Sequence, residues 1–274
     1  MQGLHKTGDC MEYGKLVGNS FGYAKEGLVG HYGKWIVLII LSVLPIIPVM
    51  LGVIFGVVSL VHSSPGTFIA VMIVAIILAI ILSFPLLGYM VLIYRGEKPA
   101  PEVTNWGALF SNGLKLFIVH LIYAIPVLIV AAAVLGSALM TIVLSASQSV
   151  TNPGSMMGLV GAVIFGIIIL IIVAFIIWII EAMAVVRFAR TNSIGEAFNF
   201  GEIFARISKI GVGSYILSLI IMAIIIGIIV GILEIIPIVG WVILIIVAPI
   251  LALFEARYLC LLYDSPAEEP KPQT

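Results

Sequence analysis

The sequence predicts an all-α membrane protein with six transmembrane helices, and three observations carry that prediction. Of the 274 residues, 62% are hydrophobic and 9% are charged, whereas a soluble domain carries roughly 25% charged residues. The apolar runs are longer than about 20 residues, the length that a helix needs to cross roughly 30 Å of hydrocarbon. The charged residues fall between these runs in an alternating pattern. A water-soluble fold cannot hide this much apolar surface.

Six apolar runs define the expected spans, and prolines at positions 45, 85 and 126 predict bends or breaks inside them. We expect an N-terminal cytoplasmic segment over 1–34, a six-span domain over 35–262 and a disordered tail over 263–274, which is rich in Pro and Glu. The expected spans are 35–61, 68–94, 116–144, 156–186, 210–233 and 241–262.

Basic residues fix the expected orientation. All 13 Lys and Arg lie before the first run, between the second and third, between the fourth and fifth, or near the end of the sixth and beyond. The other connecting loops carry none. Since cytoplasmic loops are enriched in Lys and Arg, both termini are predicted to lie in the cytoplasm, with the chain in the cell membrane.

Three polar segments on the basic side have apolar residues at helical spacing, over 13–28, 106–115 and 193–209. Each precedes a pair of apolar runs, so we expect three tandem units, each an interfacial amphipathic helix followed by a transmembrane hairpin. Ser193 and Glu196 have the spacing of a capping box for the third helix. Ordinary loop structure is the alternative for these segments.

An alignment of the three units on Lys34, Lys115 and Lys209 brings small residues into register. Such small-xxx-small steps let two helices approach closely in lipid. The predicted packing pairs are Gly52 with Gly56, Ala133 with Ser137, and Gly227 with Gly231.

Four ionisable residues stand inside the apolar runs at a similar depth from the basic side: His120, Glu181, Glu255 and Arg257. Ionisable groups in a membrane are costly, so they either pair across helices or serve a ligand. Three tyrosine hydroxyls lie at the same level, those of Tyr89, Tyr123 and Tyr258. We predict one inward-facing polar pocket lined by these seven residues, between the second, third, fourth and sixth spans. Structural ion pairs that only lock the bundle are the alternative.

One stretch of the chain carries a recognisable order of motifs. Gly88 and Tyr89 end a span, Pro-Glu follows at 101 and 102, Trp-Gly at 106 and 107, Gly-x-Lys at 113–115 and Tyr-x-x-Pro at 123–126. This order resembles the DUF4013 family of multi-spanning membrane proteins, found mainly in archaea. The likeness is clear over about residues 85 to 130. It implies location and architecture, and it supplies no catalytic residues.

No nucleotide-binding, hydrolase or metalloprotease motif occurs, and the four histidines are scattered. We therefore expect no catalytic residue, no metal and no cofactor. The favoured function is a non-catalytic binding, organising or accessory role at the cytoplasmic face. A small-solute or ion permease is the alternative, and a lipid-acting enzyme is a second one. Expected partners are membrane lipid and a protein partner or a second copy of the chain, without nucleic acid.

Overall fold

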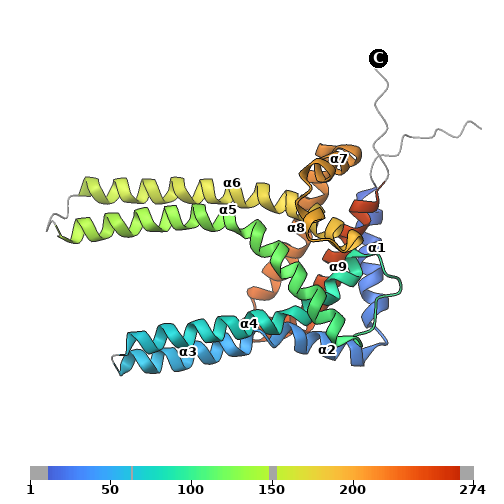
Figure 1. Cartoon of the computed structure of the whole chain (residues 1–274), viewed down its shortest axis with the longest axis horizontal. Coiled ribbons are helices and arrows are strands. Elements are labelled where there is room, and N and C mark those ends of the chain that lie inside the picture. Colours follow the sequence, from blue (N-terminus) through green and yellow to red (C-terminus); the bar gives the residue numbers. More distant parts are fainter. Residues whose placement is uncertain (1–11, 63, 148–152, 266–274) are drawn as a thin grey trace, which may run out of the picture. The chain divides into compact units, whose positions relative to one another are not determined.

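The computed structural model describes residues 12–62, 64–147 and 153–265 (Figure 1). These ranges are mostly helical and contain no strand. The remaining residues include most of the expected disordered tail, which thus lies outside the described part of the chain. In order, the elements are α1 (Tyr13–Leu28), α2 (Tyr32–Val43), α3 (Ile46–Val61), α4 (Pro65–Tyr94), α5 (Trp106–Ser147), α6 (Pro153–Thr191), the 3-10 turn η1 (Gly195–Phe198), α7 (Phe200–Ile210), α8 (Val212–Glu234) and α9 (Val239–Asp264).

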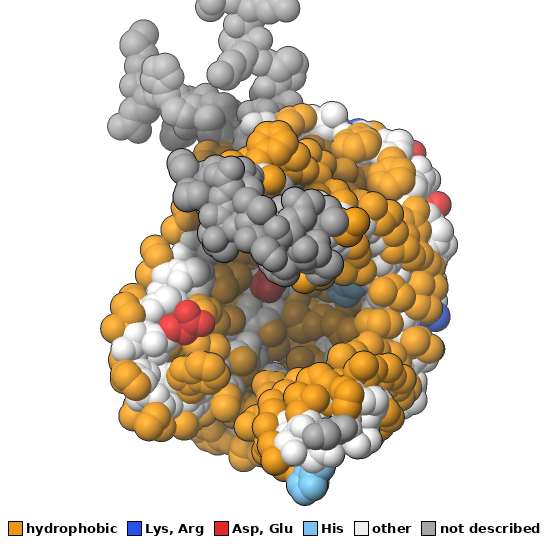
Figure 2. All heavy atoms as spheres, turned by 90° about the vertical axis from the view of Figure 1, so that its left-hand side faces the viewer, with side chains coloured by type: hydrophobic (Ala, Val, Ile, Leu, Met, Phe, Trp, Pro, Cys, Tyr) orange, Lys and Arg blue, Asp and Glu red, His pale blue; other side chains and the backbone are white. Residues whose placement is uncertain are grey.

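The prediction of six spans is confirmed. Within the described ranges, six helical stretches are long and apolar enough to cross a membrane. The first consists of α2 and α3, which are separated at Leu44 and Pro45, because proline has no N–H to continue the helical ladder. Side chains on the face shown in Figure 2 are mostly hydrophobic, as contact with lipid requires. The chain is therefore an integral, multi-pass membrane protein.

The second expected interfacial helix is not a separate element. Residues 106–115 are the first turns of α5, which continues without a break into the third span. The chain instead breaks at Gly30 and Gly211, both with φ near +90°, where α1 and α7 end and the next helix begins. Gly113 occupies a comparable place before the third span, but it stays helical. The tandem arrangement of three units is thus not confirmed.

The third expected interfacial helix is divided into η1 and α7. Asn199 caps α7, because its side-chain oxygen accepts a hydrogen bond from the N–H of Glu202 at 3.4 Å. The expected capping box does not form: Glu196 binds Arg187 instead. Ile203, Ile207 and Ile210 of α7 are buried on one face.

The apolar face of α1 packs against α9, so it does not face lipid. Phe21 and Phe254 stack with ring centroids 4.2 Å apart. Leu16, Ala24 and Leu28 are buried on the same side of the helix. An amphipathic pattern next to a membrane span therefore serves here to attach α1 to another helix.

By its contacts the chain divides into two units, unit 1 (Met1–Phe117 with Met183–Thr274) and unit 2 (Ile118–Ala182). In unit 1, α9 is the central helix and contacts α1, α2, α4 and α8. Trp35 donates to the carbonyl of Ile246 at 3.0 Å, and Tyr258 donates to that of Ser218 at 2.9 Å, which joins α2 and α8 to α9. Unit 2 is a hairpin of α5 and α6 (Figure 1).

Glycines let α4 and the start of α5 touch backbone to backbone. A Cβ on Gly88 would overlap the carbonyl of Leu109, and a Cβ on Gly113 would overlap the carbonyl of Phe84. Both glycines therefore permit a crossing that no other residue type allows.

The three predicted packing pairs lie in different surroundings. Gly52 and Gly56 are buried against α4, where added Cβ atoms would come within 2.6 Å of Ala75 and 2.8 Å of Phe68. Around Gly227 and Gly231 of α8 the space is open, and Ala133 and Ser137 of α5 are exposed. The structure thus gives the threefold register no support beyond its first pair.

Candidate functional site

The segment between α4 and α5, residues 95–105, is held in place by a buried lysine. The side chain of Lys34 donates to the carbonyl of Ala100 at 3.0 Å and forms an ion pair with Glu102 at 2.7 Å. Lys34 itself is buried, so these contacts satisfy a cation that has little access to water. The segment therefore has a defined shape next to α2.

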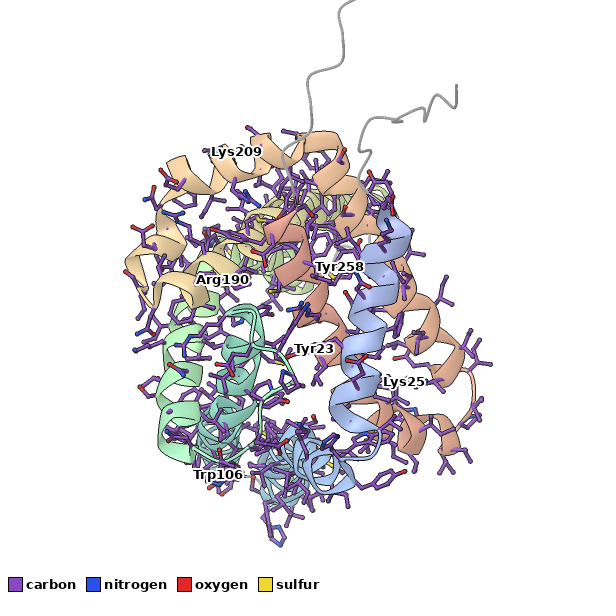
Figure 3. The ribbon with its side chains drawn as sticks, turned by 90° about the vertical axis from the view of Figure 1, so that its right-hand side faces the viewer. Tyr23, Lys25, Trp106, Arg190, Lys209 and Tyr258 are labelled. Carbon is purple, nitrogen blue, oxygen red and sulfur yellow. The ribbon has the colours of Figure 1, made fainter. Side chains whose placement is uncertain are left out.

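Two buried tyrosines hold the same segment from other helices. Tyr23 of α1 donates to the carbonyl of Glu97, and Tyr89 of α4 donates to that of Pro101, each at 3.0 Å. Burial raises the pKa of Tyr23 to about 12, against which the charge of Arg257 acts in the opposite direction. The Tyr23 hydroxyl thus remains a donor at neutral pH. Figure 3 shows Tyr23 and Lys25 on different sides of α1.

A pocket of about 530 Å³ lies between α1, this segment and α9. Buried side chains form its base and exposed polar ones its rim. The pocket is open on the side of α1, because Gly18 and Gly22 have no side chain and the space next to their Cα atoms is free. The other lining residues that matter below are Asn19, Tyr23, Glu26, Lys98, Ala100 and Arg257.

Arg257 is the buried cation of this pocket, and 3% of it is exposed. Its guanidinium carbon lies 5.0 Å from the centroid of the Tyr23 ring, a cation–π contact. Its one hydrogen bond within the described ranges goes to the sulfur of Cys260, at 3.7 Å. No carboxylate of those ranges forms an ion pair with it.

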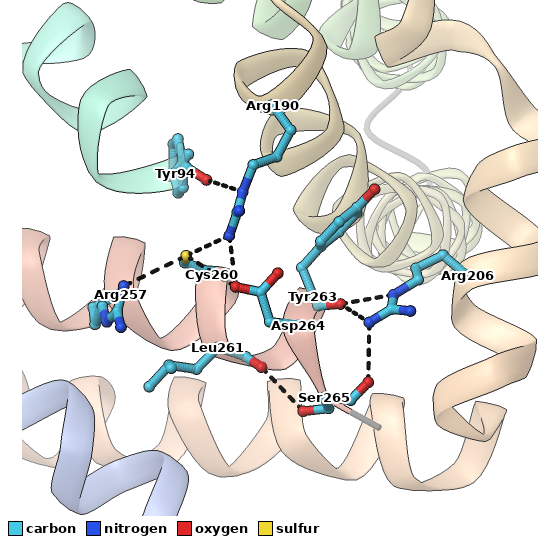
Figure 4. A network of polar contacts seen from close by, with 9 residues as sticks. All are labelled: Tyr94, Arg190, Arg206, Arg257, Cys260, Leu261, Tyr263, Asp264 and Ser265. Atoms are coloured by element: carbon cyan, nitrogen blue, oxygen red, sulfur yellow. Dashed lines mark hydrogen bonds and ion pairs between the residues drawn. The ribbon is translucent and has the colours of Figure 1, made fainter. Parts of the chain in front are cut away.

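A second arginine joins the polar contacts around Cys260 (Figure 4). Arg190 of α6 donates to the carbonyl of Tyr94 at 2.9 Å, to the sulfur of Cys260 at 3.1 Å and to the carboxylate of Asp264 at 2.6 Å. In contrast to Arg257, this arginine has a carboxylate partner. Cys260 is buried between the two guanidinium groups as a free thiol.

The members of the predicted polar cluster that belong to unit 1 make different contacts. Arg257 lines the pocket, whereas the hydroxyls of Tyr89 and Tyr258 bind the carbonyls of Pro101 and Ser218. Glu255 is half-buried on α9. The two tyrosines thus hold helices and loop together.

His120 and Glu181, the members in unit 2, form a pair. Nδ1 of His120 lies 2.5 Å from a carboxylate oxygen of Glu181, which joins α5 to α6. Tyr123 follows His120 by three residues on α5 and is buried. The single pocket expected from the sequence would draw its lining from both units, and it stays a prediction.

Sequence reasoning found Arg257 but missed the residues around it. Asn19, Tyr23 and Lys98 belong to segments that were interpreted as an interfacial helix and a connecting loop. One signal was present: Gly14, Gly18 and Gly22 recur every four residues, which leaves one side of α1 without side chains.

The lining of the pocket offers groups that can contact a polar ligand. A buried cation, an aromatic face and a rim of amide, carboxylate and ammonium groups provide donors, acceptors and charge. Within the described ranges, no three His, Cys, Asp or Glu side chains gather as metal ligands.

The fold defines an all-helical integral membrane protein with a polar pocket at the basic side. The sequence model of DUF4013, described as "Protein of unknown function", matches residues 71–239, more than half of the chain, so the chain belongs to this family. The match includes Lys98 and Ala100 of the pocket but neither α1 nor Arg257. No curated protein and no solved structure matches the chain.

Proposed function

We propose that this protein is a non-catalytic binding protein of the cell membrane that takes up a small polar ligand from the cytoplasmic side. The observation that carries the proposal is the pocket of about 530 Å³ with Arg257 at its base. Ligand sites commonly enclose roughly 300–1,000 Å³ and place a few polar groups in a mostly preformed cavity.

The orientation is part of the proposal. Two walls of the pocket, α1 and the segment 95–105, belong to the parts of the chain that contain its basic residues. Since such segments face the cytoplasm, the pocket opens there, with both termini on the same side. Three side chains, Lys34, Tyr23 and Tyr89, fix the segment 95–105, so the site is preorganised for its ligand.

Native mass spectrometry of the full chain, released from mild detergent, tests this function. Gly18→Leu places a side chain in the pocket, whereas Gly14→Leu makes the same change one turn earlier on α1, outside the lining. We expect a bound small molecule on the wild type and on Gly14→Leu, and its loss from Gly18→Leu. A wild type without any such molecule, or equal occupancy of the two variants, contradicts the proposal.

A small-solute or ion permease is the second candidate, and the His120–Glu181 pair favours it. Two titratable groups 2.5 Å apart within spanning helices have the form of a proton-exchange site. Proteoliposomes with an internal pH dye decide: a permease predicts proton uptake that Glu181→Gln abolishes, and a binding protein predicts none.

A further inference from the structure

We propose that the pocket binds a phosphate monoester, with the phosphate on the guanidinium of Arg257 and the ester body over the glycine side of α1. The inference rests on the proposed function and names its ligand class. It starts from the charge of Arg257, with which no carboxylate of the described part of the protein forms an ion pair.

Arg257 is suited to an oxyanion. A guanidinium presents N–H donors in a planar fork that matches two oxygens of a phosphate or carboxylate. In the described part of the chain it uses one such donor, toward sulfur at 3.7 Å, a weak interaction. The guanidinium carbon lies over the ring of Tyr23 at 5.0 Å, and Arg257 also lines the pocket.

The charges around the pocket favour an anion. Lys98 and Arg257 each contribute one positive charge, and Glu26 contributes one negative charge. A phosphate monoester carries about −1.5 to −2 at neutral pH and has three acceptor oxygens, so it can contact Lys98 and Arg257 together and offset the net charge of +1 that the three charged lining residues leave. A neutral or cationic ligand leaves Arg257 buried without compensation.

The pocket is larger than inorganic phosphate needs, which favours a ligand with an organic body. A volume of about 530 Å³ holds a small organic molecule, and the open side next to Gly18 provides the room. Asn19 and Glu26 on that side accept hydrogen bonds from hydroxyl groups. The ligand is therefore a phosphate monoester with an organic body, either a soluble sugar or polyol phosphate or a lipid that ends in a phosphate monoester, such as phosphatidic acid.

Four probes test the ligand class on the purified full chain in detergent by microscale thermophoresis. Glycerol 3-phosphate represents the soluble source, and dihexanoyl phosphatidic acid represents the lipid source. Glycerol and dihexanoyl glycerol are the same molecules without phosphate. We expect the wild type to bind at least one phosphate probe and neither phosphate-free probe. Binding of glycerol 3-phosphate indicates a soluble ester, and binding of the lipid probe alone indicates a headgroup.

Matched variants connect that binding to the pocket. Lys98 and Lys209 are both exposed lysines, and Lys98 alone lines the pocket. Lys98→Met should weaken phosphate binding about tenfold, and Lys209→Met should leave it unchanged. Arg257→Met should abolish it, and its fold is checked by helical circular dichroism.

Equal effects of the two lysine variants, or measurable binding of a phosphate probe that its phosphate-free counterpart matches, overturn the inference. If native mass spectrometry finds a phosphate-free molecule that Gly18→Leu removes, the inference fails while the proposed function stands. If the wild type binds nothing in either experiment, both fail.

Discussion

Replacing Gly88 by alanine should push α4 and α5 apart. The added methyl group overlaps the carbonyl of Leu109, and a backbone carbonyl in a helix cannot rotate away as a side chain does. Overpacking of this kind costs about 1–3 kcal/mol, whereas alanine gains about 0.5–1 kcal/mol over glycine in a helix. Because the backbone blocks relaxation, we place the cost at its upper end and expect a net destabilisation of about 2 kcal/mol.

Gly113→Ala attacks the same crossing from the other side, where its methyl group overlaps the carbonyl of Phe84. Because one substitution already separates the two helices, the second removes fewer contacts. The double variant Gly88→Ala, Gly113→Ala should therefore lose less stability than the sum of the two single losses.

The assay is unfolding in mixed micelles of dodecyl maltoside and SDS, followed by tryptophan fluorescence. Gly136→Ala is the control, because it lies on α5 with no atom within 4 Å of its new Cβ, and it should be neutral or slightly stabilising. The reasoning is refuted if Gly88→Ala and Gly136→Ala have the same stability, or if the stability losses of Gly88→Ala and Gly113→Ala are strictly additive.

Three further predictions concern the pocket walls and the orientation. Lys34→Met leaves a carbonyl of the segment 95–105 without its donor and should lower the free energy of unfolding by about 1–3 kcal/mol in the same assay. Lys25→Met, an exposed change on α1, should change it by no more than about 0.5 kcal/mol. Equal losses of stability in the two variants contradict the role of Lys34 in holding the segment. The pKa of Tyr23 rises from 10.0 to about 12 on folding, so its contribution is complete below pH 10 and is lost as the pH rises to 12. The difference in stability between wild type and Tyr23→Phe should therefore shrink by roughly 1–2 kcal/mol over that range, and a constant difference would falsify the assignment. In intact cells, a cysteine at Ser64 should react with an impermeant maleimide and one at Gly195 should not, whereas the opposite labelling reverses the proposed orientation.

The six spans could be predicted because hydropathy is a property of consecutive residues. The break at Pro45 likewise depends on one residue that has no N–H. The start of α5 could not be predicted in this way. Residues 106–115 continue into the span, and Gly113 among them packs against the backbone of Phe84 on another helix, a contact between segments that are distant in the sequence. Sequence periodicity describes a helical face and does not identify what covers it.

The pocket could not be predicted from the sequence, for a related reason. Its parts come from residues 18–26, 98–100 and 257, which only the packing of α1 on α9 brings together. The apolar stripe of α1 is equally suited to lipid and to a neighbouring helix, and Phe254 decides between them by stacking on Phe21. The part that could be predicted is Arg257, because a charge inside an apolar run is visible in the sequence.

Glu181 and Arg257 are alike in their expected depth in the membrane, and the structure separates them. The carboxylate of Glu181 has a hydrogen-bond partner within unit 2, where Nδ1 of His120 lies 2.5 Å away, so this contact offsets part of the cost of burying it. Arg257 has a π face and a sulfur atom, neither of which carries a full opposite charge. A charge that the fold satisfies needs no ligand, whereas one that opens on a cavity gains from an anion. This difference is the reason to look for the ligand at Arg257 first.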